Sequence, residues 1–316
     1  MSRQRLMGPP GDGVLVTGAY GLIGHAVVER LRAQGHRVVA TDRLASRPSD
    51  AAFAAEPLVV MGAARLTANL TKHGIGAIVH AAGLSGPMLA RKRPREILCV
   101  NAGGTLDLYE AARRAGVRKV VLLSSAAVYG RNTDALVKET APLLGSTPYA
   151  ASKISAEAIA RTYAASQGVA SFVLRPCWVY GARRRTDCIL RRMVGDALAD
   201  RPTNLPYGRG FPRQFIHVSD VAAAVAAAVV VERASLEIVN LSDGSWLTLD
   251  EVGAQVSSRL PGARIALGSQ APSDDEALGR LDLSRAEATL GWRPLVPLAE
   301  GLRDYLIAPT CEFSPK

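Results

Sequence analysis

The sequence predicts an α/β fold, in which a doubly wound parallel sheet is followed by a smaller, loop-rich C-terminal lobe. Short apolar, β-branched runs alternate with helical patterns through the first half of the chain. This alternation is typical of right-handed βαβ crossovers around a buried parallel sheet. A glycine-rich turn joins the first apolar run to the first helical pattern. After about Val179 the alternation becomes irregular, and glycine and proline recur, as at Pro202, Pro206 and Gly208.

Each expected element follows from its local pattern. Strands are expected at 14–16, 36–41, 77–80, 119–123 and 170–175, and helices at 21–34, 64–73, 97–115 and from about Tyr149 onward. Segments 215–218 and 237–240 are expected to return to the main sheet. The apolar run 221–231 is too short to span a bilayer, so it predicts a buried, alanine-rich helix and no membrane association.

Composition and charge narrow the class of protein. The 316 residues are 48% apolar and 5% aromatic, which suits a large aliphatic core. The four cysteines form no Cys-x-x-Cys pair and residues 1–13 lack the apolar stretch of a secretory signal, so we expect a cytoplasmic protein without a metal site. The net charge is +10, but the basic residues are scattered without interleaved aromatic residues. This favours a small anionic ligand over nucleic acid.

The glycine-rich turn at 17–24 predicts a dinucleotide site. Gly18 permits a tight turn, Gly21 lets the backbone approach a pyrophosphate, and Gly24 allows close helix packing. The amino terminus of the following helix supplies N–H donors for the phosphates. We therefore expect a dinucleotide-binding Rossmann domain over 1–178, with returns near 213–245, and a mostly substrate-binding lobe over 179–316.

Asp42 bears on the choice of dinucleotide. It ends the second expected strand, 42 − 24 = 18 positions after the last glycine of the turn, where a carboxylate can accept hydrogen bonds from an adenosine ribose. A carboxylate would repel a 2′-phosphate, so NAD is favoured. Arg43 and Arg47 leave NADP open, because a neighbouring guanidinium could hold that phosphate.

Tyr149 and Lys153 form a candidate proton-transfer pair. On a helix, a spacing of four places both side chains on one face. A tyrosine normally has a pKa of about 10. A fixed cation beside it favours the phenolate and lowers that pKa, as general acid–base catalysis at a hydroxyl or carbonyl requires. The alternative is a packed tyrosine beside a solvated lysine.

With further motifs in the same order, the chain resembles the extended short-chain dehydrogenase/reductase superfamily, specifically the NAD-dependent epimerase/dehydratase family. The resemblance covers nearly the whole chain. Its motifs are TGAYGLIG at 17–24, HAAG at 80–83, Asn-x-x-Gly-Thr at 101–105, SSAAVYG at 124–130, Tyr149-x-x-x-Lys153, RPCWVYG at 175–181, RQFIHVSDV at 213–221 and LGWRP at 290–294.

The resemblance implies roles for these residues. Tyr149 would be the acid/base, Lys153 would lower its pKa and bind the nicotinamide ribose, and Ser125 would hold the substrate oxygen. The alternative for Ser125 is a hydroxyl that satisfies backbone groups at a strand end. A homodimer is implied, through the helix at 101–115 and the helix of Tyr149. The implied cofactor-binding residues are Gly18, Gly21, Leu22, Ile23, Gly24, Asp42, Arg43, Ala81, Ala82, Gly83, Asn101, Tyr149 and Lys153.

Departures from the family pattern concern the substrate. Trp178 stands where many members have an asparagine that binds a nucleotide sugar, and Ala271 stands, in a loose alignment, where an arginine is common. Arg213 is retained. The indole of Trp178 would form a flat apolar wall for the face of a sugar or cyclitol. Arg185, in a run of three arginines, is a candidate for binding a carboxylate or phosphate, with an exposed basic turn as the alternative.

The expected function is therefore an NAD(P)-dependent oxidoreductase that transfers hydride at a secondary hydroxyl or carbonyl of a sugar, sugar acid or cyclitol. The expected substrate contacts are Ser125, Trp178, Arg185 and Arg213. One alternative is a nucleotide-sugar epimerase that reduces and reoxidises its cofactor within one cycle. Another is a dinucleotide-binding sensor without catalysis. Ala126 and Ala127 replace the Asp-Glu pair frequent in dehydratases of the family, which disfavours dehydration.

Overall fold

The computed structural model describes residues 11–43, 52–58, 62–85, 93–186, 188–232, 235–270 and 276–307. Its centre is a seven-stranded sheet in the order β12-β7-β5-β4-β1-β2-β3, with every neighbouring pair parallel. This confirms the predicted fold class. The strands are β1 (Gly13–Thr17), β2 (Val38–Asp42), β3 (Glu56–Pro57), β4 (Ile75–His80), β5 (Lys119–Leu123), β7 (Ala170–Pro176) and β12 (Leu236–Leu241).

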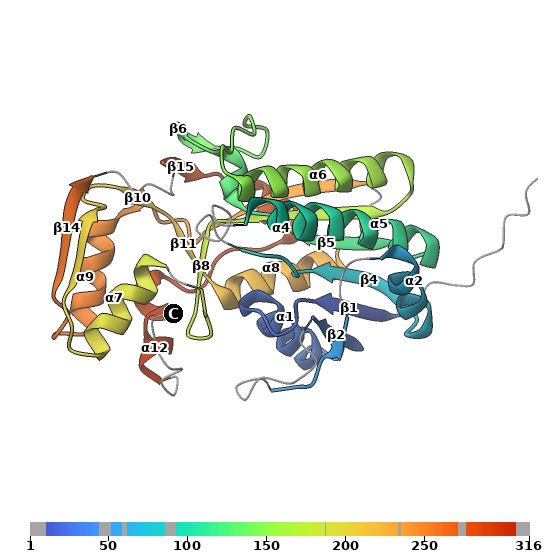
Figure 1. Cartoon of the computed structure of the whole chain (residues 1–316), viewed down its shortest axis with the longest axis horizontal. Helices are drawn as coiled ribbons and strands as arrows, with labels where there is room; N and C mark the ends of the chain where they lie inside the picture. Colours follow the sequence, from blue (N-terminus) through green and yellow to red (C-terminus); the bar gives the residue numbers. More distant parts are fainter. Residues whose placement is uncertain are drawn as a thin grey trace, which may run out of the picture.

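Helices cover both faces of this sheet (Figure 1). One face carries α2 (Ala63–Lys72), α4 (Pro94–Leu98), α5 (Gly104–Ala115) and α6 (Pro148–Ser166), and the other carries α1 (Leu22–Ala33) and α8 (Val218–Val230). The apolar side chains form one cluster on each face. The strand order reverses beside β1, so the carboxyl ends of β1 and β4 open a crevice, where ligands of such sheets bind.

The helix expected over 97–115 is interrupted. A five-residue π-helical turn, Cys99–Gly103, lies between α4 and α5. Asn101 lies in this turn, and its side chain forms hydrogen bonds with the backbone of Leu84 in the loop after β4. Single π-helical turns of this kind are common beside functional sites.

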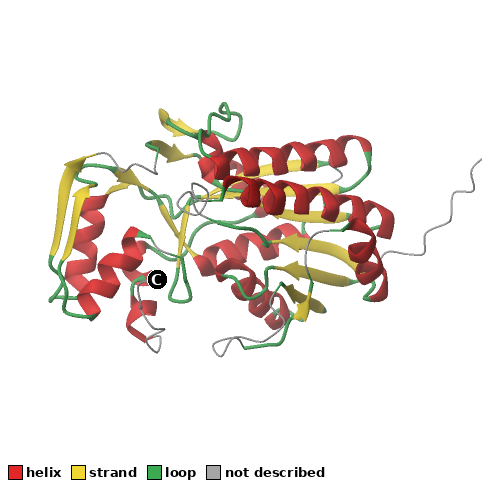
Figure 2. Cartoon of the chain, in the orientation of Figure 1, coloured by secondary structure: helices red, strands yellow, loops and turns green. Residues whose placement is uncertain are grey.

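The C-terminal lobe is built of helices and strands beside the main sheet (Figure 2), and it has its own apolar core. It contains α7 (Ile189–Leu198), β9 (Thr203–Tyr207), α9 (Leu249–Arg259) and β14 (Ile265–Gln270), together with the short pair β10 (Pro212–Arg213) and β13 (Leu247–Thr248). A further pair, β6 (Asn132–Val137) and β15 (Leu278–Leu281), borders the lobe. Within the described ranges, no helix has the length and apolar character needed to cross a membrane.

Of the two segments expected to return to the main sheet, only β12 does so. The expectation for 215–218 is wrong, because β11 (Phe215–His217) pairs with β8 (Trp178–Tyr180) in a separate two-stranded parallel sheet. Alternate side chains of β11 explain this position. Phe215 packs in the core of the C-terminal lobe, whereas Ile216 packs in the core of the main sheet, so the strand joins the two.

The chain after α10 (Ser284–Leu290) folds back onto the main sheet. The carboxylate of Asp220 on α8 accepts hydrogen bonds from the backbone N–H groups of Leu295 (3.1 Å) and Val296 (3.0 Å). Trp292 donates its indole N–H to the carbonyl of Asp220 at 3.0 Å. These contacts bring α11 (Leu298–Gly301) and α12 (Arg303–Ile307) against the C-terminal lobe.

Candidate active site

The glycine-rich turn forms a cradle that side chains would fill. Gly18 has a φ of +68°, and a Cβ there would lie 2.7 Å from the backbone of Ala82. A Cβ on Gly24 would lie 2.1 Å from the carbonyl oxygen of Gly18. Gly21 is the N-cap of α1, and no side chain caps this end of the helix. The N–H groups at the start of α1 are therefore open to an anionic ligand such as a pyrophosphate.

Asp42 lies at the end of β2 beside this turn. Its Oδ2 accepts the backbone N–H of Tyr20 at 2.9 Å, and the side chain is buried. The carboxylate thus holds the turn and lies where an adenosine ribose would approach. Arg43 is exposed, and Arg47 lies outside the described residues. The cradle and the carboxylate together fit NAD.

Asn101 joins the loop after β4 to α6. Its Oδ1 accepts the N–H of Leu84 at 2.8 Å, and its Nδ2 donates to the carbonyl of Leu84 (2.9 Å) and to Oγ of Ser152 (3.0 Å). A Cβ on Gly83 would lie 2.9 Å from the Asn101 Oδ1, so a side chain there would require Asn101 to move. The same loop is held beside the glycine-rich turn by the backbone N–H of Ala82, which donates to Oγ1 of Thr17 at 3.2 Å.

His80 connects the ends of β1, β4 and α5 beneath the crevice. Its Nδ1 lies 2.8 Å from Oγ1 of Thr17 and its Nε2 lies 3.2 Å from Oγ1 of Thr105. Burial, and to a smaller extent the charge of Lys153, lower the pKa of His80 to about 3. The imidazole is therefore neutral at physiological pH and serves as a structural bridge.

The structure brings Ser125, Tyr149 and Lys153 together. Tyr149 and Lys153 lie on α6, and Ser125 follows the end of β5. Ser125 lies beside Tyr149, and its hydroxyl acts to lower the pKa of the phenol. Oγ of Ser125 also accepts the N–H of Ala127 at 3.2 Å. Lys153 Nζ donates to the carbonyl of Leu123 at 2.7 Å and lies 6.0 Å from the centre of the Tyr149 ring.

The direction of the Tyr149 pKa differs from the prediction. Burial raises the pKa of Tyr149, while the hydrogen bond with Ser125 and the charge of Arg184 act to lower it. The expected lowering by Lys153 is absent from the protein alone because burial dominates and the ammonium is directed to the carbonyl of Leu123. Burial also lowers the pKa of Lys153 to about 8, against the charge of Glu157, which raises it.

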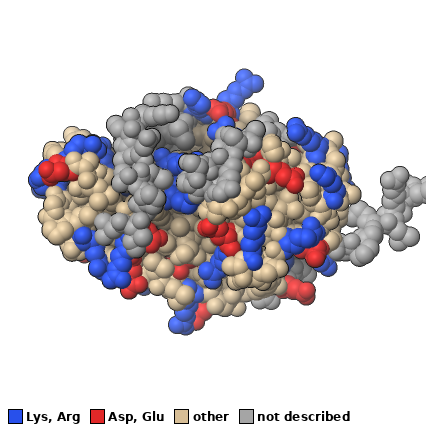
Figure 3. Space-filling model, turned by 90° about the horizontal axis from the view of Figure 1, so that it is seen from below, with Lys and Arg blue, Asp and Glu red and all other residues tan. Residues whose placement is uncertain are grey.

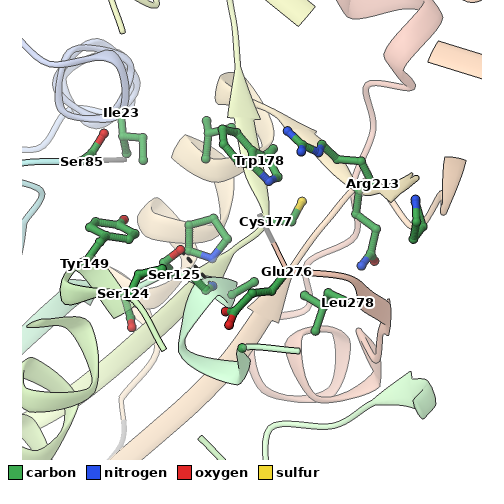
Figure 4. A pocket seen from close by; sticks show the side chains of 18 of the residues that line it. Ile23, Ser85, Ser124, Ser125, Tyr149, Cys177, Trp178, Arg213, Glu276 and Leu278 are labelled. Carbon is green, nitrogen blue, oxygen red and sulfur yellow. Dashed lines mark hydrogen bonds between the residues drawn. The ribbon is translucent and has the colours of Figure 1, made fainter. Parts of the chain in front are cut away.

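A cavity of about 190 Å³ connects the cofactor turn to these side chains. Figure 4 shows Tyr149 and Ser125 near one another, with Trp178 and Arg213 across the cavity from Tyr149. Lys and Arg side chains lie within the hollow on the face seen in Figure 3. Besides these residues, the lining includes Ile23, Ser85, Ser124, Ala126, Ala127, Cys177, Arg184, Gln214, Glu276 and Leu278.

The ring of Trp178 packs against the guanidinium group of Arg213, so it does not form a purely apolar wall. The guanidinium carbon of Arg213 lies 4.4 Å from the centre of the indole, and that of Arg184 lies 5.7 Å from it. Arg213 is only 7% exposed, and burial lowers its pKa to about 10, so it remains charged at neutral pH. The cavity therefore combines a hydroxyl pair with positive charge on an aromatic platform.

Sequence reasoning selected Arg185 from the run of three arginines, but Arg184 lines the cavity and Arg185 is exposed outside it. No sequence signal distinguishes them, because the turn at 181–186 decides which one faces inward. Gln214 donates to the carbonyl of Gly279 (2.8 Å) and accepts the N–H of Leu281 (2.9 Å), so it anchors β15. Ala271 lies outside the described residues.

Comparison with known proteins gives concordant matches. The model of the NAD dependent epimerase/dehydratase family matches residues 14–242. A UDP-glucose 4-epimerase of Mycolicibacterium smegmatis is 33% identical over 95% of this chain and 97% of its own length. A UDP-glucuronate 4-epimerase of Thermodesulfobacterium geofontis is 27% identical over 92% of this chain and 93% of its own. The structure of MoeE5 in complex with UDP-glucuronic acid and NAD has a TM-score of 0.83, with 32% identity, and covers 92% of this chain and 97% of that one.

Proposed function

Because the chain belongs to the NAD-dependent epimerase/dehydratase family, we propose that it is an NAD-dependent enzyme that inverts a secondary carbon of a negatively charged nucleotide sugar. The observation that carries this proposal is the cavity in which Ser125 and Tyr149 lie together with the guanidinium groups of Arg184 and Arg213. The similarity to proteins named as UDP-glucose and UDP-glucuronate 4-epimerases supports the substrate class. It also favours inversion over the net oxidation that the sequence alone suggested.

Bound NAD supplies the acceptor and later the donor of a hydride and, when oxidised, a positive charge that favours the phenolate of Tyr149. Ser125 Oγ donates a hydrogen bond to the reacting sugar oxygen. Tyr149 Oη removes the hydroxyl proton as the carbon–hydrogen bond breaks and the carbonyl forms. Once the sugar presents its other face, Tyr149 would return the proton to the oxygen as the carbon–hydrogen bond re-forms. No atom is gained or lost over the cycle.

Arg184 and Arg213 support a substrate with negative charge. Both guanidinium groups line the cavity, and both lie against the ring of Trp178. Arg213 is directed across the cavity from Tyr149 in Figure 4. A guanidinium can bind a phosphate or carboxylate through two parallel hydrogen bonds. A nucleotide sugar offers a diphosphate, and a uronate offers a carboxylate as well.

The proposal is tested by incubating the protein with NAD and either UDP-glucose or UDP-glucuronic acid, and following product stereochemistry by NMR and NADH by absorbance. We expect an inverted sugar without net NADH. Tyr149→Phe should lower kcat by about 10²- to 10⁴-fold, because it removes positioned proton transfer. Tyr163→Phe, on the same helix but hydrogen-bonded to Glu110, is the matched control and should retain activity. An unchanged rate in Tyr149→Phe would refute the catalytic assignment.

A second candidate is a dehydrogenase that oxidises or reduces the sugar with net turnover of NAD. Trp178 favours it, because this position often carries an asparagine in nucleotide-sugar enzymes and here presents an indole to the cavity. Stoichiometric NADH with an oxidised product would select the dehydrogenase. Tight NAD binding without turnover of any sugar would instead indicate a dinucleotide sensor.

A homodimer through α5 and α6 accompanies this proposal. The two helices lie side by side on one face of the sheet (Figure 1). Leu98 on α4 and Leu106 on α5 are 40% and 47% exposed, so their apolar side chains are accessible to a second copy of the chain. Sedimentation of the wild type should give a dimer, and Leu106→Glu should give a monomer.

We also propose a cytoplasmic location, in keeping with the free thiols of Cys99, Cys177 and Cys188.

A further inference from the structure

Three consecutive residues at the end of β5 are attached to α6. The carbonyl of Leu123 accepts Lys153 Nζ at 2.7 Å, and Ser124 Oγ donates to Glu157 Oε1 at 2.5 Å. Ser125, the next residue, lies beside Tyr149 of α6, and both side chains line the cavity. Tyr149, Lys153 and Glu157 follow one another at intervals of four, so they lie on one face of α6. Glu157 is the member of this set that has no role in the sequence-based expectations or in the proposed reaction.

Glu157 is held in a fully buried ionic contact. Glu157 is 2% exposed and Arg175 on β7 is 1% exposed. Arg175 donates from Nε to Oε1 of Glu157 (2.9 Å) and from Nη2 to Oε2 (2.6 Å). The same guanidinium donates from Nη1 to the hydroxyl of Tyr129 (2.8 Å) and to the carbonyl of Glu139 (3.0 Å). This bidentate geometry fixes both carboxylate oxygens of Glu157.

We propose that Glu157 is a positioning residue: it holds Ser124, and through it the adjoining Ser125 hydroxyl, against Tyr149, and its negative charge keeps Lys153 an ammonium. Ser124 is buried, its backbone N–H donates to the carbonyl of Leu174, and its hydroxyl donates to Glu157, so both its backbone and its side chain fix the chain where it leaves β5. The inference rests on the proposed function of Ser125 and Tyr149.

The charge effect has a defined direction. Burial lowers the pKa of Lys153 to about 8, and Glu157 opposes this shift. The titratable groups around the ammonium are His80 on β4 and Tyr149 and Glu157 on α6. His80 is neutral, because its pKa is about 3, and the phenol of Tyr149 is protonated at neutral pH. Glu157 is therefore the negative charge that offsets the burial of Lys153.

The first experiment measures Lys153 directly. Protein labelled with ¹³C at the lysine ε-carbon is titrated by NMR without substrate, and the Lys153 signal is identified by its loss in Lys153→Met. In Glu157→Gln, which keeps an oxygen for Ser124 but removes the charge, the Lys153 midpoint should fall by about one pH unit. In that variant Arg175 is left without its counter-ion, which can prevent folding. In that case the Lys153 midpoint is measured in the double variant Glu157→Gln, Arg175→Met, which removes both buried charges.

The second experiment separates position from charge through kinetics. In Glu157→Gln, kcat should fall about tenfold or more with little change in KM, and the alkaline limb of kcat should move to lower pH. In Ser124→Ala, which removes the hydrogen bond and leaves the charge, kcat should fall while the alkaline limb stays in place. Tyr109→Phe, which loses a buried hydrogen bond to Ser171 away from the cavity, is the control for stability and should keep the wild-type profile.

The outcomes distinguish the roles of Glu157 from the proposed function of Ser125 and Tyr149. An unchanged Lys153 midpoint in both Glu157 variants overturns the charge role, and a wild-type kcat in Ser124→Ala overturns the positioning role. If Tyr149→Phe keeps the wild-type rate, the proposed function fails. The NMR titration still tests the charge role in that case, because it requires no turnover.

Discussion

Replacing Asn101 with alanine should loosen the loop after β4 and weaken NAD binding. The side chain is 2% exposed and makes three hydrogen bonds, two with the backbone of Leu84 and one with Ser152. Each such bond contributes about 0.5–1.5 kcal/mol net. The three together predict a loss of about 2–4 kcal/mol in the free energy of unfolding, toward the lower end because Leu84 is half-buried and water can reach its backbone.

The assay is urea-induced unfolding followed by circular dichroism, with NAD affinity measured by calorimetry. The loop that Asn101 holds carries Ala82 and Gly83 beside the glycine-rich turn, so its release should raise the NAD dissociation constant by about tenfold, which corresponds to about 1.4 kcal/mol. Asn204→Ala, at an exposed position on β9, is the matched control and should change stability by about 0.5 kcal/mol or less.

Two results would refute this reasoning. A loss of unfolding free energy below about 1 kcal/mol would mean that water replaces the three hydrogen bonds without cost. A large loss of stability with unchanged NAD affinity would mean that the loop position does not depend on Asn101.

Three further predictions concern the cofactor turn, the substrate and pH. Gly24→Ala would place a Cβ 2.1 Å from the Gly18 carbonyl oxygen, so calorimetry should show at least about tenfold weaker NAD binding, and wild-type affinity would contradict the close packing. Arg184→Gln should lower kcat/KM for UDP-glucuronic acid about 10- to 100-fold more than for UDP-glucose, and equal losses would remove its role toward a carboxylate. The pKa of His80 is about 3 when folded, against a usual value of about 6.5. The unfolded chain therefore binds the proton first, and stability, complete above about pH 6.5, should fall by about 2 kcal/mol between pH 7 and pH 5 in denaturant titrations, but not in His80→Asn.

Local patterns account for the parts of the fold that the sequence predicts well. The β-branched runs at β1, β4, β5 and β7 and the helical periods between them are properties of neighbouring residues, and they led to the correct fold class. The roles of Gly18 and Gly24 could be predicted for the same reason, because the turn itself requires a positive φ at Gly18 and the absence of a Cβ at Gly24. The interruption of the helix at Asn101 was not predictable from the local sequence, and it coincides with hydrogen bonds from Asn101 to Leu84 on another segment.

By itself, the sequence determined the fold class, the dinucleotide turn and the shared helix face of Tyr149 and Lys153, all of which depend on short-range geometry. Only the tertiary structure decided that Arg184 rather than Arg185 enters the cavity and that Trp178 carries Arg213 on its ring. Only the tertiary structure decided, too, that burial raises the pKa of Tyr149 although a lysine lies one turn away. The physical reason is that burial, charge pairing and the direction of a side chain depend on segments far apart in the sequence.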